Sequence, residues 1–567
     1  MKRRSNAGRG SSSKVELYGI KKLRELILEL ALRGLLVAQD PTDEPASELV
    51  KKIWAEKAKQ VKNGDLKKEK PLLPIETKEQ PFELPRGWLW ERFGNLAEHN
   101  AGKTLDRGRN QGGLRDYITT SNLYWGKFDL SVVRKMPIED ADLTRCVAVQ
   151  NDLLICEGGE AGRAAVWDQD YPICFQNHIH RARFWQGINP YYAYRLLQKM
   201  SYTGEIDNFR KGVAISNMSG KALGSIPFPL PPLAEQHRIV SKIDELMALC
   251  DRLEREADAS LSGHETLVRT LLTGLVGVSD HAQFSSAWQR VSQHFDILFT
   301  FEESMDELKK AILQLAVMGR LVPQDPDDEP ASELLRKIAI EKARLVKEGT
   351  IRKEKALLPI LDTEKQFPLP EGWELCRLQE AVDVRDGTHD SPKDAAGGKT
   401  YPLITSKNFV NGEIDFHSAR EISESDHIEI SKRSLVEVDD ILFSMIGGNI
   451  GNQVMVRHPR PFSVKNVALF KYFLKSATDP QFLYLYTQEL AVELQSKASG
   501  GAQPFVSLGF LRNLVFALPP IAEQKRIVAK VNELMVLCDQ LKSRLNEAQI
   551  TQQYLADTLT KKAVAKR

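Results

Sequence analysis

The sequence lacks the features that mark a membrane protein, a secreted disulfide-bonded protein or a zinc protein. No apolar run approaches the ~20 residues that a membrane-spanning helix needs. The six cysteines are scattered and form no C-x-x-C pair, so neither a zinc site nor a disulfide framework is indicated. The basic, Gly/Ser-rich start precedes no hydrophobic stretch, so we do not interpret it as a secretory signal. We therefore expect a cytoplasmic protein that does not enter the membrane.

Motifs for catalysis are missing or broken. The segment ICEGGEAGR (155–163) lacks the G-x-G-x-x-G spacing of a dinucleotide loop, and GKT at 102–104 and 398–400 lacks the preceding glycine of a P-loop. NPYY (189–192) lacks the second proline of the [DN]-P-P-[YFW] motif of amino-methyltransferases. We interpret 155–163 and IGGNIGN (446–452) as β-hairpins, and NPYY as the start of a helix.

Two histidines lie close together in the sequence and are possible metal ligands. His178 and His180 are two residues apart on a predicted strand and would share one face, but no further Cys or His completes a metal-binding set. No nucleophile–base pattern and no acid cluster with nuclease spacing is present. We predict no catalytic residue and no metal ligand, and we expect the chain to catalyse nothing alone.

The length of the chain limits the number of domains, whereas its net charge says little about its partners. At 567 residues the chain exceeds what one hydrophobic core serves, so several domains are expected. Its 78 Lys and Arg nearly balance 76 Asp and Glu, giving a net charge of +2. Such a balance neither demands nor excludes a polyanionic partner, because the placement of the charges decides.

Internal repetition is what the sequence has in abundance. LPPLAEQHRIV (230–240) returns as LPPIAEQKRIV (518–528), and LPRGW (84–88) returns as LPEGW (369–373). Residues 35–61 likewise return at 320–346. Between these blocks lie two middles, 86–229 and 371–517, that barely resemble each other. A constant frame thus surrounds two segments that are free to differ.

The frame is predicted to be helical. Helix pairs are expected at 17–34 with 45–62 and at 304–320 with 330–347. After each LPP a heptad seam begins, formed by Ile239, Ile243, Leu246, Cys250 and Leu253 in the first copy and by Ile527, Val531, Leu534, Cys538 and Leu541 in the second. A helix of ~40 residues would be ~60 Å long and act as a spacer. Glu235 and Glu523 fall in the first turns, which favour negative charge.

The middles are predicted to be mixed, with strands prevailing. Short apolar runs are bounded by Gly, Asp and Pro, and helical patches occur near 190–201 and 480–496. Aligned by hand, YITTSN (117–122) matches YPLITSKN (401–408), and Phe175 and Asn177 match Phe462 and Asn466. The GKT motifs place Lys103 and Lys399 at similar positions in the two middle segments. We expect one fold with two different surfaces.

The arrangement resembles the DNA-specificity (S) subunit of Type I restriction-modification enzymes. The resemblance rests on L-P-P-[LI]-A-E-Q-x-R-I-V after each middle, L-P-x-G-W before each, and the paired helices between them. RDGTHDSP (385–392) is similar to a loop near the start of such domains, where the first middle has AGKTLDRGRNQ instead. The segment 277–303 has no counterpart near the N-terminus.

The resemblance implies an α+β fold, with two mixed α/β target recognition domains separated by a long antiparallel helical coiled-coil spacer and an internal pseudo-twofold repeat. The implied domains are a disordered basic tail (1–14), an N-terminal helical conserved region (15–85), target recognition domain 1 (86–229), a central conserved helical spacer (230–370), target recognition domain 2 (371–517) and a C-terminal conserved helix (518–567).

The resemblance also implies partners. Each recognition domain would read one half of a split, asymmetric target in double-stranded DNA, and the spacer would fix the unread gap. Two methyltransferase (M) subunits would bind the helices and use S-adenosylmethionine to methylate a flipped adenine in each half. Motor-nuclease (R) subunits with ATP and Mg would complete the restriction form. No cofactor is expected on this chain.

A DNA reader needs Lys and Arg for phosphates, and Arg, Asn, Gln or His for base edges. The candidates in the first middle are Lys103, Arg107, Arg109, Asn110, Gln111, Thr120, Ser121, Asn122, Tyr124, Trp125, Gln176, Asn177, His178, His180, Arg181, Arg210 and Lys211. Those in the second middle are Arg385, Thr388, His389, Lys399, Ser406, Lys407, Asn408, Asn449, Asn452, Lys465, Asn466 and Gln503. The alternative for each is a solvated surface charge or an Asn that ties a turn.

Charge counts separate the two middles. Residues 86–229 contain 18 Lys and Arg against 15 Asp and Glu, whereas residues 371–517 contain 15 against 19. The second middle must therefore gather its basic residues on one face, or leave phosphate contacts to partner subunits.

Three other functions stay open at this point. The chain could be the specificity subunit of a methylation-only system, which this sequence does not distinguish from the restriction form. It could be a self-contained adenine methyltransferase that uses GGEAG and NPYY, against which the broken motifs argue. It could also be a coiled-coil scaffold whose middles bind proteins. A preference for one DNA sequence and a loss of binding with rising salt would set the recognition subunit apart from the scaffold.

Overall fold

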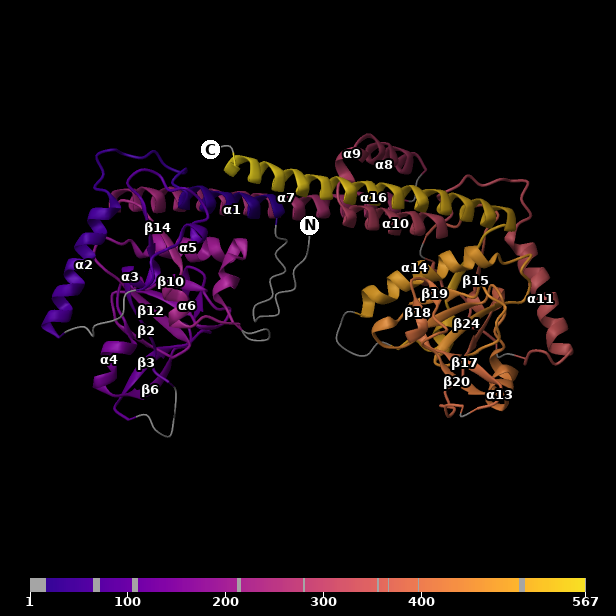
Figure 1. Cartoon of the computed structure of the whole chain (residues 1–567). Helices are drawn as coiled ribbons and strands as arrows, with labels where there is room; N and C mark the ends of the chain where they lie inside the picture. The colour runs from indigo at the N-terminus through magenta and orange to yellow at the C-terminus, as the bar shows by residue number, and fades with distance from the viewer. Residues whose placement is uncertain are drawn as a thin grey trace. The chain divides into compact units, whose positions relative to one another are not determined.

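The structure is a computed structural model that describes residues 17–64, 72–104, 111–211, 216–278, 281–353, 356–365, 367–395, 397–498 and 505–565. The chain forms two compact units, Met1–Ser260 with Gln549–Arg567, and Leu261–Ala548. Both units follow a similar order of elements, with two frame helices, a domain of short strands and a long helix after it (Figure 1). The predicted basic tail at 1–14 lies outside the described residues. Among the described helices, none is both long enough and apolar enough to span a lipid bilayer.

In the first unit the helical frame consists of α1 (Tyr18–Leu32), α2 (Ala46–Asn63) and the first part of the 45-residue helix α7 (Leu233–Gly277). Leu28 and Ala31 of α1 pack in one core with Ile239 and Ile243 of α7. Arg24 of α1 adds ion pairs to α7, at 2.6 Å from Asp251 and 2.8 Å from Glu254. α1 therefore lies along α7.

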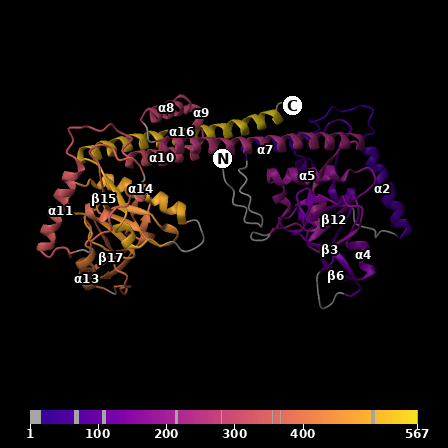
Figure 2. The same ribbon diagram turned by 180° about the vertical axis from the view of Figure 1, so that it is seen from behind.

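The second unit repeats this frame with α10 (Glu302–Val317), α11 (Ala331–Lys347) and the first part of the 45-residue helix α16 (Ile521–Ala565). Ile312 of α10 packs with Ile527 and Val531 of α16, and Lys542 Nζ lies 2.9 Å from Asp306. In Figure 2, as in Figure 1, α2 and α11 each stand beside the sheets of their own unit. The segment 277–303 contains α8 (His281–Gln293) and α9 (Phe295–Leu298).

The predicted frame helices are confirmed, with ends that differ by at most three residues. The heptad seam is confirmed at its start, because Ile239 and Ile243 are fully buried and Cys250 is 1% exposed. The seam residue Leu253 is 39% exposed, so the buried stripe ends before it.

Between its frame elements the first unit carries a domain of short strands, here domain 1, closed by β1 and β14. Its strands are β1 (Leu89–Arg92), β2 (Ala97–Ala101), β3 (Gly113–Ile118), β4 (Leu123–Tyr124), β5 (Lys127–Phe128), β6 (Arg134–Ile138), β7 (Val147–Ala148), β8 (Leu153–Cys156), β9 (Gly158–Gly159), β10 (Ala164–Val166), β11 (Ile173–Phe175), β12 (Ile179–Phe184), β13 (Ser216–Asn217) and β14 (Pro227–Leu230). Its helices are α3 (Phe93–Leu96), α4 (Asp140–Cys146), α5 (Pro190–Thr203) and α6 (Gly220–Gly224). Two four-stranded sheets result, with strand orders β10-β8-β12-β2 and β6-β3-β11-β7.

The second unit carries the equivalent domain 2, closed by β15 and β25. Its strands are β15 (Glu374–Arg377), β16 (Val382–Asp386), β17 (Thr400–Ile404), β18 (Phe409–Val410), β19 (Glu413–Ile414), β20 (Arg420–Ser423), β21 (Ile441–Ser444), β22 (Gln453–Met455), β23 (Ser463–Val464), β24 (Val467–Tyr472) and β25 (Val515–Leu518). Its helices are α12 (Leu378–Ala381), α13 (Glu424–Ser434), α14 (Pro480–Ala498) and α15 (Leu508–Arg512). The larger sheets have orders β16-β24-β21-β22 and β20-β17-β23.

Strand β8 shows how each domain is layered. Alternate side chains of a strand point to opposite faces, so Leu153 and Ile155 join the core shared with α5 and the frame, whereas Leu154 and Cys156 join the core under the second sheet. Strand β21 divides in the same way, with Phe443 on one face and Leu442 on the other. One sheet of each domain is therefore buried on both faces.

Several local predictions in the middles are confirmed. Strands β8 and β10 pair as an antiparallel hairpin around 155–163, and β21 and β22 do the same around 446–452. NPYY opens α5, whose N-cap Asn189 accepts a hydrogen bond from the backbone N–H of Tyr191. The prediction that His178 and His180 share one face of a strand is wrong, because β12 begins at Ile179. His178 is therefore exposed, whereas His180 is buried, with 3% of its surface exposed.

The repeated LPP motif ties each domain to its frame. The indole N–H of Trp88, from LPRGW, donates to the buried carboxylate of Glu235 at 2.9 Å, and Trp373 donates to Glu523 at 3.0 Å. Both glutamates lie in the first helical turn as predicted, but they serve as buried acceptors, and burial raises the pKa of each.

The next residues of the motif extend the connection. Gln236 accepts from the backbone N–H of Asn189 at 2.8 Å, and Gln524 accepts in the same way from Asp479 at 2.7 Å. Arg238 pairs with Asp43 at 2.6 Å in the loop before α2. Because one motif joins the helix, the end of the domain and the preceding helical pair, two domains require two copies of it.

Candidate DNA-recognition interface

Domain 1 brings two loops together where β2 and β11 end. The backbone N–H of Lys103 donates to Phe175 at 3.1 Å, and the N–H of Asn177 returns to the carbonyl of Lys103 at 2.9 Å. Gly102 makes this approach possible, because a Cβ there would lie 2.2 Å from the carbonyl oxygen of Phe175. We call this contact of 102–104 with 175–178 the loop junction of domain 1.

Other predicted residues of domain 1 lie around this junction. The N–H of Gln176 donates to Ile118 at 3.1 Å, which places the turn after β3, with Thr120 and Ser121, beside it. The carbonyl of His178 accepts from Glu157 at 2.8 Å. The structure therefore gathers six candidates, namely Lys103, Thr120, Ser121, Gln176, Asn177 and His178.

Two further candidates extend this edge through β9 and β13. Lys211 forms an isolated bridge with Asn217, and Asn217 pairs with Gly158 in the β9–β13 ladder. Lys211 is exposed. Arg210 is half-buried, because its guanidinium donates to the carbonyl of Ala161 at 2.7 Å.

Domain 2 has the same junction with different side chains. The N–H of Thr388 donates to Val464 at 2.9 Å, and the N–H of Asn466 donates to Thr388 at 3.2 Å. A Cβ on Gly387 would lie 2.4 Å from the carbonyl oxygen of Val464. The N–H of Lys465 donates to Ile404 at 2.9 Å, so the turn after β17 adjoins the junction as well. The candidates gathered here are Thr388, His389, Ser406, Lys407, Lys465 and Asn466.

These bonds correct the hand alignment. Ile118 pairs with Phe175 and Ile404 pairs with Val464, so Val464, not Phe462, corresponds to Phe175. The match of Asn177 with Asn466 is confirmed by their equivalent bonds at the junctions.

The pairing of the two GKT lysines is also wrong. Thr388 is the equivalent of Lys103, because both lie just after the junction glycine and form the isolated bridge to the opposite loop. Lys399 instead precedes β17, where its ammonium lies 2.8 Å from Glu424. That carboxylate raises the pKa of Lys399.

The junctions are anchored by ion pairs of opposite polarity. In domain 1 the loop supplies the cation, because Lys103 pairs with Asp142 of α4. In domain 2 the strand that leads into the loop supplies the anion, because Asp386 at the end of β16 pairs with Arg433 of α13. Sequence reasoning missed both helix partners, since only the tertiary fold brings α4 and α13 to the loops.

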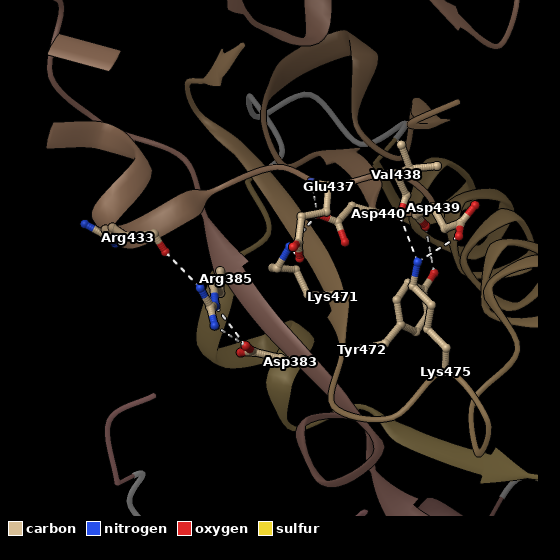
Figure 3. Close-up of polar contacts among 10 residues, drawn as sticks. All are labelled: Asp383, Arg385, Arg433, Glu437, Val438, Asp439, Asp440, Lys471, Tyr472 and Lys475. Carbon is tan, nitrogen blue, oxygen red and sulfur yellow. Dashed lines mark hydrogen bonds and ion pairs between the residues drawn. The ribbon is translucent and has the colours of Figure 1, made fainter. Parts of the chain in front are cut away.

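Arg385 belongs to a network beside the domain 2 junction (Figure 3). Its guanidinium donates to Asp383 at 2.8 Å and to the backbone carbonyl of Arg433 at 3.4 Å. In the same view Lys471 lies 2.7 Å from both Glu437 and Asp440, and burial raises the pKa of Asp440 to about 6. Arg183 and Asp152 form the corresponding pair in domain 1 at 2.7 Å. Because the Lys471–Asp440 pair of domain 2 recurs as Arg183–Asp152 in domain 1, we assign this ion pair to the stability of the fold and not to the recognition of DNA.

Five candidates are buried. Thr388, 9% exposed, lies in the junction, where its hydroxyl accepts a hydrogen bond from the backbone N–H of Asp390 at 3.1 Å. The other four are enclosed inside their domains. Asn122 and Asn408, 7% and 5% exposed, each accept from a threonine backbone N–H three residues earlier and thus close a turn. Arg181, 1% exposed, donates to the carbonyls of Thr144 and Val147. The prediction that these three residues contact DNA directly is wrong, because each side chain is enclosed in its domain and hydrogen-bonded there.

His180 is excluded on the same ground. Its ring is 3% exposed, lies 3.3 Å from the carbonyl of Met218, and has a pKa lowered by burial. Its neutral ring therefore belongs to the interior of domain 1, not to a DNA-facing surface.

The remaining candidates lie at the periphery or outside the described residues. Tyr124 is exposed and has Arg163 stacked at 5.7 Å, and Trp125 donates to Glu160 at 2.8 Å. Gln111 is exposed two residues before β3, and Asn449 and Asn452 lie in the loop between β21 and β22. Arg107, Arg109, Asn110 and Gln503 lie outside the described residues.

Polar side chains, and not a metal-binding cluster among the described residues, characterise this interface. Among the described residues there is no group of three His, Cys, Asp or Glu side chains that could hold a metal ion. The arrangement instead presents amides, hydroxyls, lysines and imidazoles on loops joined by backbone hydrogen bonds, a set suited to phosphates and base edges.

Comparison with known proteins agrees with the repeat. A sequence model of the family "Type I restriction modification DNA specificity domain" matches residues 85–262 and 370–551. The Type I restriction enzyme EcoAI specificity subunit of Escherichia coli is 38% identical over 582 residues, covering 99% of this chain and 96% of its own. The EcoEI specificity subunit of Escherichia coli is 38% identical over 589 residues with the same coverage.

A solved structure is also similar. The HsdS subunit from Thermoanaerobacter tengcongensis aligns with a TM-score of 0.43 and 17% identity, covering 86% of this chain and 99% of that chain. The two matches to the family model and the full-length identity to both Escherichia coli subunits establish the relationship. The chain belongs to the family of Type I restriction-modification specificity subunits.

Proposed function

We propose that this chain selects the DNA target of a Type I restriction-modification complex, with each domain reading one half of a split, asymmetric sequence. One observation carries the proposal: both domains form the same loop junction from the same backbone hydrogen bonds, but with different side chains and reversed ion pairs. A constant backbone with variable side chains is what two readers of unlike half-sites require.

The chemistry of the junctions suits duplex DNA. Exposed Lys407 and Lys211 are available for phosphates, while amides and imidazoles such as Asn466 and His178 can meet base edges. Phosphate contacts would position each domain, and base contacts would give specificity. Salt should therefore weaken binding to all sequences, while loop substitutions should change preference.

We also propose that the helical frame holds two M subunits, one on each unit, and R subunits in the restriction form. In support, Leu249 of α7 and its repeat equivalent Leu537 of α16 are 39% and 46% exposed. Exposed apolar residues at equivalent positions suit a partner that binds twice. S-adenosylmethionine, ATP and Mg would then be bound by those partners and not by this chain.

Mapping of adenine methylation in the native host, with and without this gene, tests the proposal. We expect one split motif, methylated on both strands, to disappear with the gene and to return when the gene is restored. The motif would also give both half-sites and the gap between them. An unchanged methylation pattern in a host that transcribes the gene would overturn the assignment.

A further inference from the structure

We infer that Asn466 contacts an adenine in the half-site of domain 2, and that His389 and Asp386 are positioning residues that fix its amide. The inference rests on the proposed function and adds to it one residue, one base and a mechanism of orientation. It is built on a chain of contacts at the domain 2 junction.

The chain of contacts begins inside the domain and ends at its surface. Asp386 is 6% exposed, and its carboxylate pairs with Arg433 and lies 2.9 Å from Nε2 of His389. Nδ1 of His389 lies 3.2 Å from the amide oxygen of Asn466. The His389 side chain is 62% exposed, and Asn466 is half-buried. A buried charge thus orients an imidazole, which in turn orients a surface amide.

The backbone of Asn466 supports a fixed role. Its φ is +56°, a left-handed conformation, and its N–H donates to Thr388 at 3.2 Å. The junction therefore fixes where the side chain starts, and the imidazole fixes how the amide is turned. Both are needed for a base contact, because an amide that rotates freely presents donor and acceptor in either order.

The fixed orientation suits adenine. An asparagine reads adenine by accepting from N6–H and donating to N7. The amide oxygen has two lone pairs, so one can accept from His389 while the other stays available, and both amide hydrogens remain free for N7. Both ring nitrogens of His389 face acceptor oxygens, Nε2 the Asp386 carboxylate and Nδ1 the Asn466 amide, so the ring holds both contacts in the form that carries a hydrogen on each nitrogen.

Domain 1 lacks this arrangement and offers an internal comparison. Asn177 holds the position of Asn466, but the residues equivalent to Asp386 and His389 are Ala101 and Thr104. The chain of contacts is therefore a property of domain 2 and not of the repeated fold. Variants at its members should alter only one half of the target.

The experiment uses Asn466→Gly, because glycine keeps the left-handed backbone while removing the amide. The full chain is co-expressed with its methyltransferase subunits, and binding is measured against duplexes carrying the mapped motif with each base pair replaced in turn. The wild type should discriminate each correct base pair by roughly 5- to 150-fold. In the variant, discrimination should fall below about twofold at a single A·T pair of one half-site and stay unchanged elsewhere.

Two controls separate reading from folding. Asn151→Gly removes another left-handed asparagine, φ +72°, from domain 1 away from the junction, and should leave every position unchanged. His389→Ala should weaken discrimination at the same A·T pair, whereas His389→Asn, whose amide N–H can replace Nδ1–H, should restore much of it. A structural role would not produce that rescue.

The outcomes are distinct. If Asn466→Gly keeps full discrimination at every position, or lowers affinity equally for all duplexes, the inference is overturned. If the lost position is a G·C pair, the assignment to adenine is overturned. If the wild-type gene restores no split motif, the proposed function fails first, and that result is visible before any variant is made.

Discussion

Arg92 and Arg377 occupy the same position in the two units and make the same contacts. Each guanidinium is held between backbone carbonyls and a glutamate, Glu79 or Glu364, at 2.7 Å. The junction ion pairs, in contrast, reverse their polarity between the domains. The charged contacts of the frame therefore repeat between the units, whereas the ion pairs beside the loop junctions do not.

The Arg377–Glu364 pair should give stability a defined pH dependence. Arg377 lowers the pKa of Glu364 to about 2, below the ~4.3 of an unfolded glutamate. A lowered pKa in the folded state means that the pair stabilises the fold above pH ~4.5, and that this stabilisation is lost as the pH falls toward 2. Glu364→Gln should lower the unfolding temperature at pH 6, and its difference from the wild type should become small as the pH falls to 2. A difference that persists unchanged at pH 2 would contradict the ion-pair origin.

The four asparagines near the loops show which residue roles could be predicted from the sequence and which could not. Asn122 and Asn408 lie one and two residues after a Thr-Ser pair, a position that suited DNA contacts as well as turns, but both close buried turns. Asn177 and Asn466 have no stronger local signal, yet they lie at the junctions. Residue type alone does not separate the two roles, because burial depends on which distant strand lies opposite.

At the scale of elements, prediction from sequence succeeds where periodicity is long. The frame helices follow a repeated apolar spacing over many residues, so their positions were within reach. The junctions were not, because they join segments about 75 residues apart through backbone hydrogen bonds. The only local signals were the glycines at 102 and 387, which permit the close approach.

The two copies of the LPP motif give a matched comparison between the units. Glu523 accepts from Trp373 and also from Gln324 at 3.0 Å, whereas one carboxylate oxygen of Glu235 has no hydrogen-bond partner among the described residues. Trp88→Phe should therefore destabilise its unit by about 1–3 kcal/mol, and Trp373→Phe should destabilise the other unit less.

Urea unfolding of the full chain measures this difference, with the transition of each unit followed separately. The lost ring volume is the same in both variants, and both tryptophans lie edge-on to an aromatic ring at 6.5 and 6.4 Å. The two packing losses therefore cancel in the comparison. Equal losses of stability would show that the second acceptor bond of Glu523 contributes nothing.

For the whole molecule, the repeat makes stoichiometry a test of the scaffold. Leu249 and Leu537 are equivalent and exposed, so replacing either with glutamate should leave folding within about 0.5 kcal/mol of the wild type. If each unit binds one M subunit through this helical surface, Leu249→Glu and Leu537→Glu should each reduce the complex from two M subunits to one. The double variant should bind none, and native mass spectrometry counts the subunits directly.

A single variant that keeps two M subunits, or loses both, would contradict independent and equivalent binding to the two units. A single variant that binds one M subunit would lack the methyltransferase at one half-site. It should therefore methylate one strand of the motif and leave the other unmodified. That result would link the repeat in the sequence to the split target that it is proposed to serve.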